Sequence, residues 1–290
     1  MRNNFEEQLG NLKQTSGTEV APQLTNLQQT TLSFVATTEM VDLPSRGKFY
    51  PEGHPLFNKL SIEIKQMTAK EEDILTNKSF IKKGVLIDKL LESIIIDKTV
   101  SPSSLLVGDK NAIMIAARIT AYGAEYEIGI NCLECGGKNT TTVDLLQTKT
   151  KDIDTIDAEK NIEYTRSPDG TFSFKLPKCG WNVCCRLLNG EDEKNLINLL
   201  DSKKKNSFDN EISLSEQLYF IIHSINDIKD KKVIQDAIAM MPAFDAKFLR
   251  TTYAKLIPNI SVYKKFVCSS CKDEQEVEVP FTQEFFWPKW

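Results

Sequence analysis

The spacing of apolar residues in the first half of the chain changes from a strand-like to a helical period. Apolar residues alternate with polar ones over 60–64, which predicts a half-buried strand. Farther along, helical spacing predicts one helix over about 84–97 and another that is capped by Asp109 and ends at Gly123. The first half is therefore expected to combine helices with short strands.

The second half has the same order of strands followed by helices. Residues 172–176 and 183–188 alternate and are predicted to pair across the 177–182 turn. Helical periods predict four helices, over about 191–202, 213–225, 230–241 and 243–256. We expect an α+β fold that is mostly helical and contains short β-hairpins.

Two segments without a clear apolar period divide the chain. Residues 1–40 begin with a stretch rich in Gln, Asn, Thr and Gly, and are expected to form a flexible arm or a segment that orders only against a partner. Residues 148–161 are rich in charge and are expected to link an N-terminal lobe, 41–147, to a C-terminal lobe, 162–280. An aromatic tail, 281–290, follows the second lobe.

Two Cys-x-x-Cys pairs, Cys132/Cys135 and Cys268/Cys271, stand in matching surroundings near the end of each lobe. Apolar residues occur two and six positions before each first cysteine, and eight and ten positions after each second one. These even offsets predict that each pair forms a tight knuckle between two strands of a hairpin. Two such knuckles would supply the four thiolates of a tetrahedral, closed, structural zinc site, resembling a split zinc ribbon.

The two pairs lie farther apart than in a usual zinc ribbon, where about 15–20 residues separate them. Here residues 136–267 lie between the pairs. Closing a loop about eight times longer costs only about 2 kcal/mol more, whereas structural zinc contributes on the order of 10–16 kcal/mol. A shared site then requires that the intervening chain is folded. The alternatives are thiols buried as small apolar side chains and a redox pair, although neither pair begins a helix that would activate a thiol.

The remaining three cysteines are expected to be reduced core thiols. Cys184 and Cys185 lie in a predicted strand and point to opposite faces, and Cys179 precedes a turn glycine. A metal role for Cys179 and Cys184 is the alternative. The odd number of cysteines and the polar start of the chain, which lacks a signal-peptide core, favour a reducing compartment.

Composition narrows the classes of function. The chain has 290 residues, 41% of them hydrophobic, and a net charge of −4 with a pI of about 5.5. A nucleic-acid-binding protein usually presents a basic face, which this charge balance does not favour. The longest apolar run, 112–117, is too short to cross a bilayer. We expect a soluble cytoplasmic protein.

We find no pattern of residues typical of an active site. The chain has no phosphate-binding loop and no nucleophile elbow. His54 lies in a predicted turn, and His223 lies in an apolar run where a hydrogen-bonded, partly buried histidine is expected. The acidic cluster at Glu71 suits the first turn of a helix, where negative charge is favourable. We therefore predict a protein that is not an enzyme.

The C-terminal tail is unusually aromatic. Its rings are Phe281, Phe285, Phe286, Trp287 and Trp290. Exposed rings would form an apolar patch of the kind that marks an interaction surface, and buried aromatics commonly anchor interfaces. The tail is therefore expected either to dock into another subunit, with these five residues as partner-binding residues, or to fold back over its own core.

Three short motifs resemble a known family. The segments 43–51 (LPSRGKFYP), 67–75 (MTAKEEDIL) and 118–126 (RITAYGAEY), together with the paired Cys-x-x-Cys, resemble baseplate hub proteins of T4-type contractile-tailed bacteriophages. The resemblance covers about residues 40–290. It implies a structural or assembly role in the tail baseplate, in a protein made in the cytoplasm of the infected host.

The leading prediction is thus a non-enzymatic hub subunit or hub-assembly factor that acts through contacts with other tail and baseplate proteins on a zinc-stapled scaffold. Its expected locations are the host cytoplasm during assembly and the baseplate of the virion. A zinc-ribbon nucleic-acid-binding regulator is the first alternative. An enzyme with an unrecognised site is the second.

Overall fold

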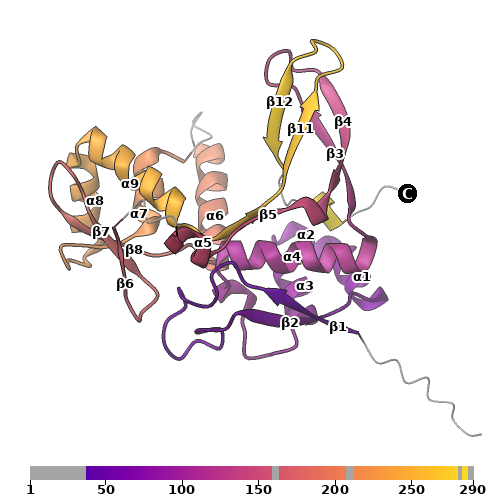
Figure 1. The fold of residues 1–290 in the computed structure, drawn as a ribbon, viewed down its shortest axis with the longest axis horizontal. Coiled ribbons are helices and arrows are strands. Elements are labelled where there is room, and N and C mark those ends of the chain that lie inside the picture. Colours follow the sequence, from indigo (N-terminus) through magenta and orange to yellow (C-terminus); the bar gives the residue numbers. More distant parts are fainter. Residues whose placement is uncertain (1–36, 159–162, 207–211, 280–282, 287–290) are drawn as a thin grey trace, which may run out of the picture. The chain divides into compact units, whose positions relative to one another are not determined.

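The computed structural model describes residues 37–158, 163–206, 212–279 and 283–286. Figure 1 draws these residues as coloured ribbon. The described part contains helices α1–α9 and several small antiparallel sheets, which confirms the α+β class. Most of the predicted N-terminal arm, 1–36, lies outside the described residues, and its last residues belong to the first strand.

The first half begins with a two-stranded sheet that is followed by helices. Strand β1 (Thr38–Asp42) pairs antiparallel with β2 (Ser61–Lys65), which contains most of the alternating segment predicted as a strand. The next elements are α1 (Ala69–Leu75), α2 (Lys78–Lys82), α3 (Leu86–Ile94) and the 3₁₀ helix η1 (Pro102–Ser104). The α3 helix buries its apolar stripe, as its periodicity predicted, but it is shorter than expected at both ends.

Helix α4 (Val107–Tyr122) is the central helix of this half. Asp109 is not its cap, because Leu106 holds that position and Asp109 lies fully buried in the first turn. The Asp109 carboxylate accepts hydrogen bonds from the Ser45 backbone N–H (2.9 Å), the Ser45 hydroxyl (2.6 Å) and the Tyr50 hydroxyl (2.9 Å). Burial raises the pKa of Asp109, although these donors act in the opposite direction. The network fastens the 43–51 motif to α4.

The segment predicted to be a linker is folded onto both halves. Strand β5 (Lys149–Lys151) pairs antiparallel with β10 (Asn259–Ser261), and α5 (Ile153–Ala158) follows with Ile153 fully buried. Arg46 forms an ion pair with Asp152 at 3.3 Å. The charges that suggested a linker therefore lie on the surface of a segment whose apolar residues are buried.

A four-stranded antiparallel sheet organises the second half. Its strands are β6 (Thr165–Arg166), β7 (Phe172–Lys175), β8 (Asn182–Cys185) and β9 (Ile222–Ile225), in that order across the sheet. The helices are α6 (Gly190–Asn206), α7 (Leu214–Ile221), α8 (Lys231–Met240) and α9 (Ala243–Leu256). The helix predicted over 213–225 ends at Ile221, because Ile222–Ile225 pair with β8.

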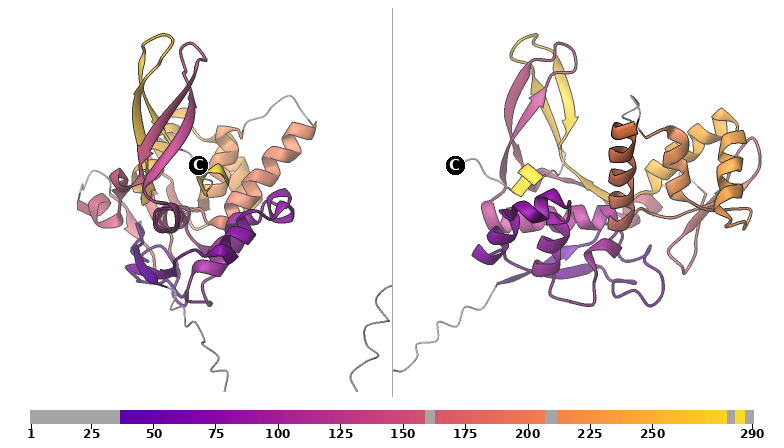
Figure 2. Two further views of the ribbon diagram at one scale, coloured as in Figure 1. Left: turned by 90° about the vertical axis from the view of Figure 1, so that its right-hand side faces the viewer. Right: turned by 180° about the vertical axis from the view of Figure 1, so that it is seen from behind.

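Two hairpins extend from this framework. The first is β3 (Glu125–Asn131) with β4 (Lys138–Asp144), and the second is β11 (Tyr263–Val267) with β12 (Glu274–Glu278). Figures 1 and 2 show the hairpins side by side with their turns at the same end, consistent with hydrogen bonds from the turn of each hairpin to a strand side chain of the other. Short 3₁₀ helices follow each hairpin, η2 (Leu145–Gln147) and η3 (Gln283–Phe286).

Both hairpins arise next to α4. Strand β3 starts directly after the C-cap of α4, at Gly123, whose φ of 84° is left-handed and suits glycine. Strand β10, which leads into the second hairpin, packs along α4. At Gly108 the two backbones are so close that an added Cβ would lie 2.2 Å from the carbonyl oxygen of Pro258.

We predict that Gly108→Ala lowers the free energy of unfolding by about 2 kcal/mol, because the Cβ forces β10 away from the helix. This loss exceeds the stabilisation of roughly 1 kcal/mol expected from the higher helix propensity of alanine relative to glycine. Urea unfolding measures it. Gly129→Ala in β3 is the matched control, since a Cβ there has open space, and it should not destabilise the protein. Wild-type stability in Gly108→Ala would contradict the close approach.

Candidate metal centre

The first Cys-x-x-Cys pair forms the turn of the β3–β4 hairpin. The Cys132 backbone N–H donates to the carbonyl of Gly137 at 2.9 Å, and the Gly136 N–H donates back to the Cys132 carbonyl at 2.9 Å. Gly136 has a φ of 68°, in the left-handed region that glycine adopts without strain. These bonds fold the turn tightly and bring its two thiols to the same side.

The second pair has the same construction in the β11–β12 hairpin. The Cys268 N–H donates to the Asp273 carbonyl at 2.9 Å, and the Lys272 N–H donates to the Cys268 carbonyl at 3.0 Å. Lys272 occupies the position of the first turn's glycine and has a φ of 65°. A non-glycine residue in this region is uncommon, so the turn holds it there against its intrinsic preference.

The two turns bring all four thiols together. The Sγ atoms of Cys132, Cys135, Cys268 and Cys271 lie within 4.8 Å of one another. Two contacts cross between hairpins, Cys132 to Cys271 at 3.6 Å and Cys135 to Cys268 at 3.7 Å. A tetrahedron with metal–sulfur bonds of about 2.3 Å has edges of about 3.8 Å. The predicted meeting of the two pairs is confirmed, and the sulfurs are arranged so that they can hold a metal ion.

The cluster is half sheltered. Cys132 and Cys268, the first cysteine of each pair, are buried, whereas Cys135 and Cys271 are exposed. Four sulfur ligands complete a tetrahedral coordination sphere and leave no position for a substrate or a reactive water. This donor set therefore suits a structural ion rather than a catalytic one.

Two carboxamides lie against the sulfurs. The Asn139 amide donates from Nδ2 to the Sγ of Cys268, and the Gln275 amide donates from Nε2 to the Sγ of Cys132, each at 3.5 Å. Our sequence interpretation did not include either residue. A signal was present, since each carboxamide stands four positions after the second cysteine of its own pair.

The thiols affect one another's ionisation. Hydrogen bonds from the Cys271 backbone N–H and the Asn139 amide lower the pKa of Cys268 to about 6. At Cys271 the backbone N–H of Asp273 stabilises the thiolate, but desolvation and the neighbouring thiols raise the pKa to about 12. Four thiolates this close repel one another, so full ionisation requires a bound cation.

The other three cysteines are separate from this cluster. Cys185 is buried in β8, and burial raises the pKa of its thiol. Cys184 and Cys179 are half-buried, and the Cys179 backbone N–H donates to Asp245 at 2.8 Å. Within the described ranges, the four-cysteine cluster is the one group of histidine, cysteine and carboxylate side chains with metal-binding proximity.

The two histidines do not form a catalytic pair. His54 stacks on Tyr50, accepts the Leu56 backbone N–H at Nδ1 and shares a 2.9 Å hydrogen bond with Ser104 at Nε2. His223 is partly buried as expected, but its buried Nε2 has no hydrogen-bond partner within the part of the chain that the structure describes. The expectation of a fully satisfied histidine is therefore wrong for this atom.

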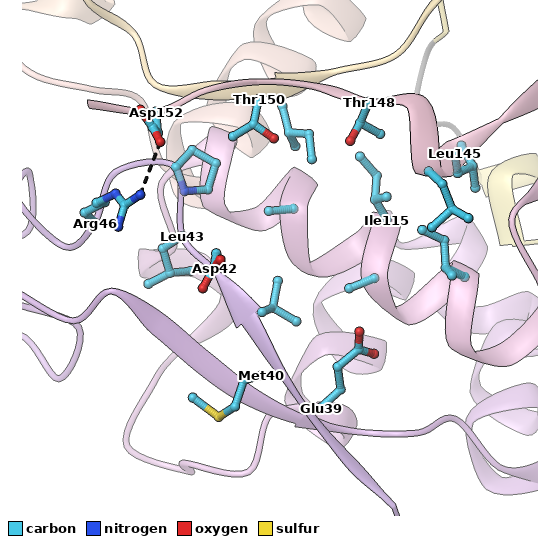
Figure 3. Close-up of a pocket in the computed structure, with 17 residues that line it drawn as sticks. Glu39, Met40, Asp42, Leu43, Arg46, Ile115, Leu145, Thr148, Thr150 and Asp152 are labelled. Carbon is cyan, nitrogen blue, oxygen red and sulfur yellow. Dashed lines mark hydrogen bonds and ion pairs between the residues drawn. The ribbon is translucent and has the colours of Figure 1, made fainter. Parts of the chain in front are cut away.

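An open groove of about 480 Å³ lies over α4. Figure 3 shows its apolar floor, which includes Ile115, and its two walls, β1 with Met40 on one side and the segment with Thr150 on the other. The polar groups Arg46 and Asp152 on its rim are paired with each other. Glu39 and Asp42 also line the groove, so it combines an apolar floor with charged walls.

The aromatic tail is only partly described. Phe285 and Phe286 are fully buried, so the structure shows these two rings folded back on the chain's own core rather than available for docking. Phe285 packs edge-to-face on Tyr126 at 5.1 Å, and its carbonyl accepts a 3.0 Å hydrogen bond from Nε of buried Arg118. The other three rings, at positions 281, 287 and 290, lie outside the described residues.

We predict that Phe285→Ala lowers the free energy of unfolding of the isolated protein by about 3–4 kcal/mol, because it leaves a cavity beside Tyr126. Chemical unfolding of the purified protein measures the change. Phe244→Ala is the control, because Phe244 is 58% exposed, and it should change stability by less than about 0.5 kcal/mol. If Phe285 instead served only a partner, its replacement would leave the isolated protein unchanged.

Comparison with known proteins identifies the family. The profile of a family described as "T4 bacteriophage base plate protein" matches residues 35–287, which is most of the chain. Comparison with curated proteins and with solved structures gave no match. In the described ranges no helix has the length and apolar character needed to cross a bilayer. The match confirms the resemblance seen in the motifs: this chain belongs to the T4 bacteriophage base plate protein family.

Proposed function

We propose that this protein is a non-enzymatic component of the baseplate hub of a contractile phage tail, as a hub subunit or a hub-assembly factor, and that a structural zinc ion joins its two hairpins. The family match supports the baseplate role. The observation that carries the zinc staple is the set of four sulfurs from residues far apart in the sequence, all within 4.8 Å.

Zinc suits this set of ligands. Four thiolates in a tetrahedron are typical of structural zinc, and zinc has no redox chemistry that would make the site labile. The ion would supply the positive charge that four ionised thiols require. It would bind Cys132 and Cys135 on one hairpin and Cys268 and Cys271 on the other, as a cross-link between distant parts of the chain.

The scaffold is proposed to act through protein contacts. Large apolar side chains stand exposed on the described surface, including Leu133 at 82% in the first knuckle and Met40 at 60% beside the groove. Isolated exposed apolar residues are ordinary on protein surfaces. These two, however, lie at the first knuckle and at the groove, which we propose as places of contact with other proteins. Phe281, Trp287 and Trp290 remain proposed docking residues for another tail or baseplate protein.

A nucleic-acid-binding role is the weaker candidate. Zinc-ribbon hairpins that bind nucleic acid need a basic face. In the second hairpin Lys265 stands opposite Glu276, and Tyr263 stands opposite Glu278. The hairpin surface thus mixes both signs of charge, and the net charge of −4 gives no attraction to phosphates.

We predict that the protein purified from zinc-containing medium holds zinc in a 1:1 ratio, and that Cys→Ser at position 132, 135, 268 or 271 lowers zinc content and stability sharply, since binding contributes on the order of 10–16 kcal/mol. Elemental analysis and thermal unfolding measure both. Cys184→Ser is the control, because it leaves the four-cysteine cluster intact and should retain the zinc content of the wild type. Undiminished zinc content in any of the four variants would remove that residue from the ligand set.

We predict that tagged protein co-sediments with baseplate complexes from infected cells, because the scaffold works by contact with other tail proteins. Deleting residues 287–290 should reduce this association and preserve the fold, which circular dichroism checks. A hub subunit stays with purified virions, whereas an assembly factor is found only in the lysate. Salt-sensitive binding to DNA or RNA without association with tail proteins would instead support the regulator.

A further inference from the structure

Asn139 connects the first hairpin to the knuckle of the second. Its side chain extends from β4, and Oδ1 accepts hydrogen bonds from the Ser269 backbone N–H (2.8 Å) and hydroxyl (2.9 Å). The same amide donates from Nδ2 to the Sγ of Cys268 at 3.5 Å. One side chain of the first hairpin therefore holds both a ligand sulfur of the second and the backbone of the next residue.

Gln275 makes the reciprocal connection. It extends from β12, and its Oε1 accepts the Leu133 backbone N–H at 3.1 Å. Its Nε2 donates to the Sγ of Cys132 at 3.5 Å, and also to the Asp273 carboxylate at 2.8 Å. Again the amide holds a ligand sulfur of the other hairpin together with the residue that follows it.

The two positions are equivalent in their hairpins. Asn139 stands opposite Ile130, and Gln275 stands opposite Phe266. Each of these apolar partners lies two residues before the first cysteine of its pair. The two sets of contacts are therefore related by the pseudo-twofold equivalence of the hairpins and are not two unrelated surface hydrogen bonds.

We propose that Asn139 and Gln275 are positioning residues of the metal site, and that each sets the ligand geometry of the opposite hairpin. This inference rests on the metal site proposed above. A carboxamide is suited to the task because one group both accepts from the backbone and donates to sulfur. Groups around a metal's ligands orient them and tune affinity, and N–H donors here offset the negative charge of four thiolates bound to a divalent ion.

The proposal has a structural consequence. Each knuckle is held by the hydrogen bonds of its own turn and, in addition, by the carboxamide of the opposite hairpin, so the full set of contacts to its ligands forms only when the two hairpins meet. The metal site is then formed jointly by the two hairpins.

Zinc competition with a chromogenic chelator tests the first part, using the full-length protein. Asn139→Ala and Gln275→Ala should each weaken zinc affinity about 10- to 100-fold. Thr140→Ala in β4 and Glu276→Gln in β12 are matched controls on the same strands, since their exposed side chains make none of these sulfur contacts, and they should retain wild-type affinity. Affinities in the alanine variants equal to those of the controls would overturn the proposal.

The aspartate and glutamate variants separate the two halves of each carboxamide. Asn139→Asp keeps the oxygen that accepts from Ser269 but replaces the donor to sulfur with a negative charge. It should weaken zinc binding at least as much as Asn139→Ala. Gln275→Glu should act in the same way on the Cys132 side. An aspartate variant with wild-type zinc affinity would contradict the N–H to sulfur contact.

Hydrogen exchange of the metal-free protein supplies a readout that is independent of zinc. Asn139→Ala should speed exchange of the Ser269 amide in the opposite hairpin, and Gln275→Ala should speed that of Leu133, whereas Asn139→Asp should leave Ser269 protected. Faster exchange confined to the mutated hairpin would overturn the cross-hairpin role. Wild-type protein that binds no zinc would overturn the metal site and the positioning role together, whereas zinc-bound protein with unchanged variants would overturn only the latter.

Discussion

The close contact between helix α4 and strand β10 is the constraint on which the arrangement of the molecule depends. At Gly108 the helix meets the backbone of Pro258 without room for a Cβ, and at its other end α4 passes through Gly123 directly into β3. Both hairpins therefore leave the framework beside the same helix, although residues 145–262 separate them in the sequence. The buried Asp109 network fastens the 43–51 motif to that helix as well, so a single element positions the motif and the cysteine pairs.

The position of the four-sulfur cluster explains why a long interval between cysteine pairs is compatible with one site. The entropic cost of closing a long loop applies to a flexible chain. Here most of residues 136–267 form strands and helices, and their packing fixes the two ends of this segment relative to each other. Strand β5, near its start, also pairs with β10, near its end. A metal bound at the proposed site would then join two hairpins that already lie side by side.

The places where sequence interpretation and structure differ share one physical cause. Residues 222–225 continue the helical spacing of apolar residues, yet they pair with β8, because the periodicity of so short a segment does not distinguish a helix from a strand. Asp109 is of a residue type that commonly caps helices, but its hydrogen-bond partners are Ser45 and Tyr50, which are remote in sequence. Residues 148–158 are rich in charged residues, as a linker would be, because their charged side chains lie at the surface. Ile153 in the same segment is nevertheless buried. In each case contacts between distant segments outweighed a local preference.

The sequence by itself determined the α+β class, the approximate limits of several helices and the knuckles, because spacing of apolar residues and tight-turn chemistry are local properties. It also identified the four cysteines and the family, through motifs that need no knowledge of the fold. Only the tertiary structure decided that the sulfurs approach to 3.6–3.7 Å across hairpins, that Phe285 lies against Tyr126, and that Asn139 and Gln275 reach the opposite knuckle. These contacts depend on the relative placement of two hairpins, and the packing around α4 sets that placement.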